Sequence, residues 1–260
     1  MKTRAGQIPI RSGGQLDMLR RAGETASRIL GEVAAMIQPG VTTGDVDAEA
    51  ARLIAKAGCQ SAFLGYRKFP GNICISVNEE VVHGIGGPRV IRYGDIVKID
   101  VGVVQDGWVG DNAVTVPVGM IAPETQRLLM TTEEALHLAL SYAREGEYLS
   151  TLCASVETHV VSKGYSVVRE YVGHGVGRKL HEEPQIPNYW EGSSKGPRLR
   201  EGMVLAVEPM VNQGAPRVRT LEDRWTVVTL DGKPSAHFEH TVVVHKGEPE
   251  ILTWRERLRL

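Results

Sequence analysis

The sequence has few cysteines, few aromatic residues and no long apolar run. The three cysteines, Cys59, Cys74 and Cys153, are odd in number and lack metal-knuckle spacing, which argues against a disulfide framework. No segment reaches the roughly 18–20 consecutive apolar residues that a membrane-spanning helix needs. The basic residues near the N-terminus are not followed by an apolar stretch, so we expect no secretory signal. These absences favour a cytoplasmic protein with no membrane partner.

Charge of one sign is also not in excess. The 30 basic and 31 acidic residues give a formal net charge of −1, which provides no electrostatic attraction for nucleic acid or anionic membranes. A hydrophobic content of 42% and a charged content of 23% are typical of globular proteins. Nothing in the sequence indicates an obligate partner subunit, so we expect a monomer.

Four segments have the apolar periodicity and the boundary residues of helices. The first ends before Pro39-Gly40, and the second follows Thr42 and Thr43, either of which can cap it. We expect helices over residues 15–37, 45–57 and 124–144, and a fourth helix from a cap at Ser150 or Thr151 to Gly164.

The two helical pairs are related by an offset of 106 positions. This offset separates Gly40 from Gly146, Gly58 from Gly164, and Ala48 from Ala154. Either the chain contains two similar halves, or two ordinary helix-loop-helix units coincide. Short turns and the lack of a low-complexity linker favour one domain over residues 1–260, with a short arm at about 1–11.

Strand-like segments follow each helical pair, and turn residues separate them. We expect strands at 73–77, 96–104 and 113–118 in the first half, and at 166–172, 203–211, 225–230 and 241–244 in the second. The turn at Gln105-Asp106-Gly107 makes a hairpin that could bring Asp100 near Asp111.

Four carboxylates and one histidine interrupt or border these strands: Asp100, Asp111, His174, Glu208 and Glu239. Most of them also fit an ordinary structural role. Asp100 and Lys98 alternate with apolar residues and could face solvent, Asp111 could be a turn residue, and Glu239 could lie on a strand edge. Glu208 resists such a role, because a carboxylate flanked by apolar residues is seldom buried unpaired. Pro209 also interrupts the strand there.

Taken together, the five residues favour a metal site. Four carboxylates balance the charge of two divalent cations, and oxygen-rich ligation with one imidazole suits Mn, Fe or Co, with Zn also acceptable. Two such ions typically lie about 3.5–4 Å apart with a hydroxide between them. The ligands are scattered along the chain, so their spacing alone does not establish the site.

Six motifs together resemble the type I methionine aminopeptidases, which are M24 metallopeptidases. They are CISVNEEVVHGIG (74–86), GDIVKIDVG (94–102), GWVGDNAVTV (107–116), GHGVGRKLHEEP (173–184), EGMVLAVEPMVN (201–212) and SAHFEHTVVV (235–244). The resemblance runs from about residue 12 to 250. It implies an α+β pita-bread fold with internal pseudo-twofold symmetry, in which helices flank a central antiparallel sheet.

The resemblance also implies roles for the polar residues. Asp100 would bind one metal ion, His174 and Glu208 the other, and Asp111 and Glu239 would bridge both. Glu208 is similar to the general base of the family. His83 and His181 match histidines that contact the substrate and stabilise the tetrahedral intermediate, although an isolated histidine is usually structural.

The family's methionine pocket matches Phe63, Tyr66, Phe69, Cys74, Leu180 and Trp225. Two of them depart from the family's common pattern in ways that bear on the shape of the pocket: Phe63 stands where a cysteine is frequent, and Leu180 replaces an aromatic residue. Ordinary core packing is the alternative for all six residues.

The resemblance implies removal of N-terminal methionine from nascent polypeptides, with a small second residue preferred. It leaves ribosome association open. A related enzyme acting on Xaa-Pro bonds is the closest alternative, but such enzymes usually carry a large additional N-terminal domain. A non-catalytic peptide-binding protein of this fold is a further alternative, and such proteins usually lose metal ligands.

Overall fold

The computed structural model describes residues 7–192 and 194–255, in which four α-helices lie outside antiparallel strands. The helices are α1 (Gly14–Ala34), α2 (Thr43–Lys56), α3 (Pro123–Ser141) and α4 (Leu149–Ser162). A 3-10 helix, η1, covers Tyr66–Lys68. The strands of the first half are β1 (Gln60–Ser61), β2 (Cys74–Val77), β3 (Glu80–Val82), β4 (Ile96–Gln105) and β5 (Trp108–Pro117).

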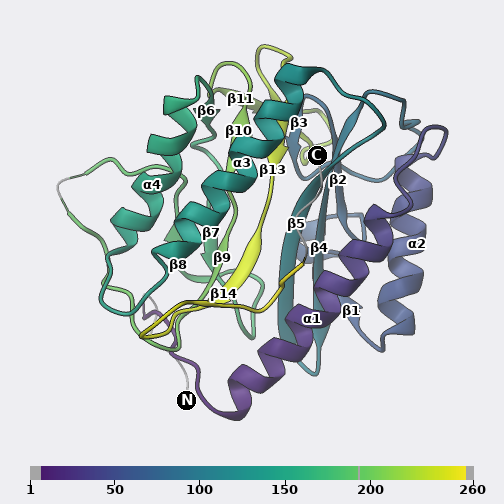
Figure 1. The fold of residues 1–260 in the computed structure, drawn as a ribbon. Helices are drawn as coiled ribbons and strands as arrows, with labels where there is room; N and C mark the ends of the chain where they lie inside the picture. The colour runs from purple at the N-terminus through teal and green to yellow at the C-terminus, as the bar shows by residue number, and fades with distance from the viewer. Residues whose placement is uncertain (1–6, 193, 256–260) are drawn as a thin grey trace.

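The second half contains shorter strands. They are β6 (Ser166–Val167), β7 (Gly173–Gly175), β8 (Glu182–Ile186), β9 (Val204–Val207), β10 (Met210–Asn212), β11 (Val218–Thr220), β12 (Val227–Thr229), β13 (Ser235–His237), β14 (His240–Val243) and β15 (Glu250–Ile251). Figure 1 shows α1 and α2 on one side of the strands and α3 and α4 on the other. The short arm expected at about 1–11 lies partly outside the described residues, and residues 7–12 have no regular secondary structure.

The helices follow the expected pattern closely, with one correction at α4. The capping box of α2 is present, because the Asp45 amide donates to Thr42 Oγ1 and the Thr42 amide donates to Asp45 Oδ2. The expected cap of α4 at Ser150 or Thr151 is wrong, since its N-cap is Tyr148. The Leu149 and Ser150 amides instead donate to the carbonyls of Pro197 and Lys195. A distant loop therefore satisfies the amides that a capping side chain would otherwise bind.

The internal repeat is visible in the helices. Both α2 and α4 contain 14 residues, and each end of α4 lies 106 positions after the matching end of α2. The main hydrophobic cluster also draws on both halves, since it includes Ile29 and Val97 from the first and Leu152 and Val242 from the second.

The long hairpin of β4 and β5 carries the first two carboxylates of the set. Its register pairs Asp100 with Ala113 and Gly102 with Asp111, so the two aspartates are close on adjacent strands, as expected. Helix α1 packs against both strands, and a Cβ on Gly110 would lie 2.1 Å from the Ala22 carbonyl oxygen. Only glycine allows this close approach of the helix.

The solvent-facing alternative for Lys98 and Asp100 is wrong. Lys98 is 2% exposed, and its ammonium donates to the carbonyls of Asn78 and Ser235 at 2.7 and 3.0 Å. Asp100 faces an interior pocket. Successive side chains along β4 therefore point to two faces that are both covered. One face lies under α1 and the other lies against the second half, so neither is exposed to solvent.

The segment expected as one strand at 203–211 is two strands, β9 and β10, separated by Glu208 and Pro209. The segment that pairs with these strands has a matching two-residue gap, Phe238-Glu239, between β13 and β14. Because β9 pairs with β14 and β10 with β13, the two gaps lie opposite each other. The interruption that Pro209 predicts is confirmed, and the strand-edge alternative for Glu239 is wrong.

Among the residues that the structure describes, no helix is both long enough and apolar enough to span a bilayer.

Candidate metal centre and substrate pocket

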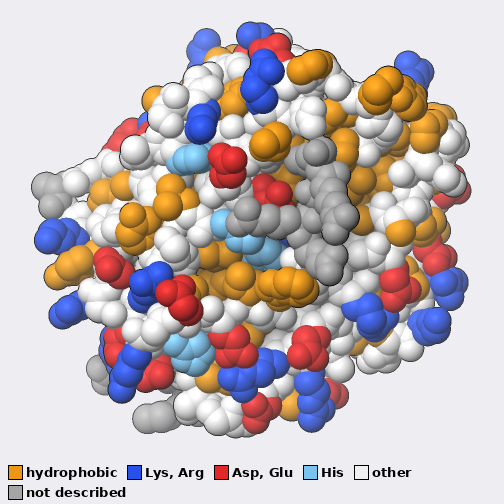
Figure 2. Space-filling model, viewed as in Figure 1, with side chains coloured by type: hydrophobic (Ala, Val, Ile, Leu, Met, Phe, Trp, Pro, Cys, Tyr) orange, Lys and Arg blue, Asp and Glu red, His pale blue; other side chains and the backbone are white. Residues whose placement is uncertain are grey.

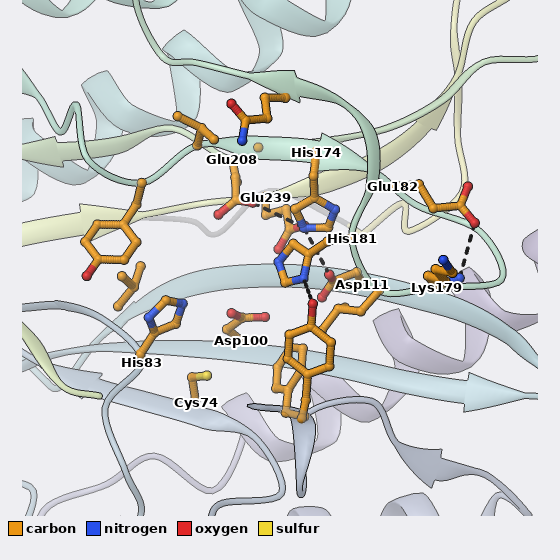
Figure 3. Close-up of a pocket in the computed structure, with 18 of the residues that line it drawn as sticks. Cys74, His83, Asp100, Asp111, His174, Lys179, His181, Glu182, Glu208 and Glu239 are labelled. Atoms are coloured by element: carbon orange, nitrogen blue, oxygen red, sulfur yellow. Dashed lines mark hydrogen bonds and ion pairs between the residues drawn. The ribbon is translucent and has the colours of Figure 1, made fainter. Parts of the chain in front are cut away.

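All five carboxylate and histidine candidates line one pocket of about 780 Å³. Asp100 and Asp111 come from the β4–β5 hairpin, His174 from β7, and Glu208 and Glu239 from the two opposed strand gaps. Figure 3 shows the glutamates approaching from one side of the pocket and the aspartates from the other. On the surface, histidine and acidic side chains gather near the middle of one face (Figure 2).

Three of these residues form a compact cluster. One ligand atom each from Asp111, His174 and Glu239 lies within 4.8 Å of the other two, and all three residues are buried. His174 Nε2 is 3.7 Å from Asp111 Oδ2 and 3.5 Å from Glu208 Oε1. Asp100 and Glu208 line the same pocket outside this compact cluster.

The tautomer of His174 leaves one ring nitrogen of the cluster free to bind a cation. Its Nδ1 is 2.9 Å from the Gly175 carbonyl oxygen, which can only accept, so Nδ1 carries the proton. Burial lowers the pKa of His174 to about 3, so the ring is neutral. Its Nε2 lone pair therefore faces the Asp111 and Glu208 carboxylates, an arrangement that favours a cation between them.

The environment of the carboxylates also favours a bound cation. Burial first, and then the nearby Asp111, raise the pKa of Asp100 well above its ordinary value. Burial and the aspartates do the same to Glu208, and burial raises the pKa of Asp111 to about 7. Asp100 Oδ1, Asp111 Oδ1 and Glu239 Oε1 are buried without a hydrogen-bond partner. Buried oxygens in this state are costly, and divalent ions would satisfy them.

The two other histidine candidates lie on the walls of the pocket. His83 follows β3 with a φ of 60°, and its ring meets those of Tyr171 and Trp225 edge-on at 5.3 and 6.1 Å. The next residue, Gly84, has no room for a side chain, because a Cβ would lie 2.1 Å from the Ile75 carbonyl oxygen. This packing holds His83 in an uncommon backbone conformation.

His181 lies between β7 and β8, and its ring centroid is 4.2 Å from that of His174. Its Nδ1 is 2.7 Å from the Tyr66 hydroxyl. Burial lowers the pKa of both His83 and His181 to about 4, with smaller contributions from His181 and Arg67 respectively. Both rings are therefore neutral at pH 7, and each has one N–H to donate.

The remaining candidates form the apolar part of the pocket. Phe69 and Trp225 pack edge to face at 5.1 Å, and Phe63 lies so close to β4 that a Cβ on Gly102 would be 2.4 Å from its ring. The six expected pocket residues, Phe63, Tyr66, Phe69, Cys74, Leu180 and Trp225, all line the pocket. Burial and the nearby Asp100 raise the pKa of the Cys74 thiol, which is therefore not a reactive thiolate.

Sequence reasoning missed two polar neighbours of the site. His237 Nε2 lies 3.5 Å from Glu208 Oε2, and burial lowers the pKa of His237 to about 3. His237 stands two residues before Glu239, and this spacing was a usable signal. Tyr171 also lines the pocket beside His83, and no sequence pattern singled it out.

Known proteins match this chain over almost its whole length. The model of metallopeptidase family M24 matches residues 17–246. Methionine aminopeptidase 1 of Bacillus subtilis is 50% identical over 239 residues, which are 92% of this chain and 96% of that protein. The crystal structure of methionine aminopeptidase from Thermotoga maritima is 42% identical, has a TM-score of 0.93, and is matched over 96% of this chain and 100% of its own.

A prolidase from Pyrococcus horikoshii shares the fold at 23% identity and a TM-score of 0.78, and this chain covers 65% of it. These likenesses confirm the expected pita-bread fold and the expected resemblance. This chain belongs to metallopeptidase family M24 and, within it, to the methionine aminopeptidases.

Proposed function

We propose that the chain removes the N-terminal methionine from newly made cytoplasmic polypeptides, using two divalent metal ions within one catalytic domain. One observation carries this proposal: four carboxylates and a neutral histidine converge in one pocket, and Asp111, Glu239 and His174 among them are buried. Fe, Mn, Co or Zn would suit this donor set. Both halves of the chain supply ligands, which supports a single catalytic unit.

We assign the ligands by the resemblance of their motifs to those of the family. Asp111 and Glu239 would bridge the two ions, Asp100 would bind one ion, and His174 and Glu208 would bind the other. The compact grouping of Asp111, His174 and Glu239 supports this assignment. When bound, the ions lower the pKa of a water molecule and polarise the scissile carbonyl.

Glu208 would act as the general base, taking the proton from water and passing it to the leaving amine. Its side chain lies between His174 and His237, at 3.5 Å from each, and its main-chain carbonyl accepts a hydrogen bond from Asn188 Nδ2 at 3.0 Å. The Asn188 hydrogen bond fixes the main chain from which the Glu208 carboxylate reaches the pocket. A buried base with a raised pKa holds its proton more readily than an exposed glutamate.

His83 and His181 would donate hydrogen bonds to the substrate's carbonyl oxygen as it gains negative charge. Both are neutral at pH 7, so each remains a donor without placing a full charge beside the metal ions. With the Tyr66 hydroxyl donating to Nδ1 of His181, 2.7 Å away, the ring proton would lie on Nε2 and would be available to the substrate.

The aromatic part of the pocket would hold the methionine side chain. A thioether gains dispersion and sulfur–aromatic contacts from rings such as Phe63, Phe69 and Trp225. The second residue would then lie against the rings of His83, His181 and Tyr66, which would restrict it to a small side chain.

The test uses metal-stripped protein supplied with single metals. We expect restored cleavage of Met-Ala-Ser, slower cleavage when the second residue is Phe or Arg, and faster cleavage of Met-Gly-Met than of an Ala-Pro peptide. Preference for Ala-Pro would assign the chain to Xaa-Pro hydrolysis. Elemental analysis showing no bound metal, together with no turnover, would indicate a peptide-binding protein instead.

A further inference from the structure

An arginine outside the pocket reaches the back of two proposed ligands. Arg255 lies just after β15, and its guanidinium donates from Nη1 to the Glu239 carbonyl at 3.2 Å and from Nη2 to the Ala113 carbonyl at 2.9 Å. Burial lowers the pKa of Arg255 to about 10, so the group stays charged at pH 7. A cation is therefore held in the interior directly behind the candidate metal centre.

The Ala113 and Glu239 carbonyls lie where the first half of the fold contacts the second half. Ala113 follows Asp111 by two residues on β5, and its carbonyl also accepts a hydrogen bond from the Glu239 amide at 3.0 Å. The planar guanidinium therefore spans the strand of one proposed bridging ligand and the main chain of the other. Its planar fork holds its donors in fixed directions, which the rotatable ammonium of a lysine does not.

The segment before Arg255 is attached to the same place. The Leu252 amide donates to the Thr241 carbonyl at 2.8 Å, and Thr253 Oγ1 accepts from the Thr241 amide at 3.0 Å. Thr241 Oγ1 in turn donates to the Asp111 carbonyl at 2.8 Å. The C-terminal segment is thus connected by hydrogen bonds to both proposed bridging residues.

Charge supports the same role. Asp111, Glu208 and Asp100 place negative charge near Glu239, whereas Arg255 places a positive charge beside its main chain. Among the described residues, Glu133 of α3 is the other carboxylate whose charge acts on Arg255. The guanidinium therefore offsets part of the repulsion that gathers at the carboxylates.

We propose that Arg255 is a positioning residue of the metal centre, which joins β5 to the Glu239 main chain and so sets the separation of Asp111 and Glu239. This inference rests on the dimetal site proposed above. Arg255 supplies no ligand atom. Its loss weakens metal binding because the two carboxylates no longer start in the chelating arrangement.

The experiment measures Mn²⁺ binding to metal-stripped protein by titration calorimetry, together with kcat and KM of the metal-saturated enzyme. We expect Arg255→Met to weaken Mn²⁺ binding by about 10- to 100-fold, as loss of groups that orient ligands does elsewhere. Arg255→Lys keeps the charge but loses the planar fork, so its Mn²⁺ affinity should lie between those of the wild type and Arg255→Met. The kcat should fall more than KM changes.

Arg20→Met is the matched control. Arg20 pairs with Glu250 and Asp17 and so holds the same C-terminal segment, but it does not touch the pocket. Wild-type Mn²⁺ affinity in Arg255→Met, or an equal loss in Arg20→Met, would overturn the proposal. If Arg255→Met does not fold, Arg255→Lys decides by the same criterion. A wild-type protein that binds no Mn²⁺ would instead contradict the dimetal function itself.

Discussion

The Tyr66 hydroxyl and the His181 Nδ1 lie 2.7 Å apart, although the two residues are 115 positions apart in the chain. Tyr66 begins η1, and His181 stands in the loop between β7 and β8. Their rings are also close, with centroids 5.2 Å apart. This contact fixes the orientation of the imidazole.

Replacing Tyr66 should impair catalysis without removing metal. We expect Tyr66→Phe to lower kcat/KM by about fivefold, the equivalent of one hydrogen bond of about 1 kcal/mol. Mn²⁺ affinity should stay at the wild-type value. Steady-state kinetics and calorimetry measure the two quantities. Tyr93→Phe, at a residue that is 60% exposed, is the control and should change neither. An unchanged kcat/KM in Tyr66→Phe would show that the contact does not serve the reaction.

Glu208→Gln should stop turnover while the fold remains. Gln has nearly the same shape but cannot take a proton from water, so we expect kcat to fall by about 10²- to 10⁴-fold, the usual contribution of a general base. Circular dichroism should match the wild type. Glu201→Gln removes an exposed carboxylate from the turn before β9 and should keep full activity. Substantial turnover in Glu208→Gln would rule out the proposed base.

The aromatic ring of Phe63 should limit the size of the first residue. Phe63→Ala opens the wall beside Gly102. Relative kcat/KM should therefore shift from Met towards bulkier first residues in a peptide series. The cavity should also cost about 3–5 kcal/mol of unfolding free energy, measured by urea denaturation. Leu64→Ala, at a neighbour that is 55% exposed, should leave selectivity and stability nearly unchanged. If Phe63→Ala kept the wild-type selectivity for the first residue, the methionine side chain would not bind against Phe63.

His83 should make the metal-free protein less stable in acid. Its pKa is about 4 in the folded state, against an ordinary value of 6.5, because it is buried among Tyr171, Trp225 and the imidazoles of His181 and His237. The unfolded chain therefore binds a proton more readily between these values. Stability is retained above pH 6.5 and lost as the pH falls towards 4, by at most about 3 kcal/mol.

The measurement is the unfolding free energy of wild type and His83→Gln at pH steps from 7.5 to 4. The unfolding free energy of the wild type minus that of His83→Gln should shrink or reverse as the pH falls. Titration of the other groups affects both proteins and largely cancels in this difference. His159→Gln is a suitable control, because His159 lies near the protein surface on α4. A difference that does not vary with pH would contradict the lowered pKa of His83.

Local patterns were enough to predict the helices and the aspartate hairpin. The periodicity and caps of α2 and the turn after Gln105 depend on neighbours within a few residues. The break at Glu208 was also readable, because Pro209 cannot donate to a strand ladder. The short strands β1, β3, β7, β8, β11, β13 and β15 were missed, since two to five residues leave little periodicity.

The sequence by itself determined which segments would be helices, because helices depend on residue chemistry and short-range geometry, and its motifs named the candidate metal ligands through their resemblance to a known family. Only the tertiary structure decided that Glu208 and Glu239 occupy opposed gaps, that Lys98 is buried, and that Arg255 reaches Ala113 and Glu239. These outcomes depend on pairing between strands far apart in the chain. The interactions that stabilise such pairs form only once the two halves have packed together.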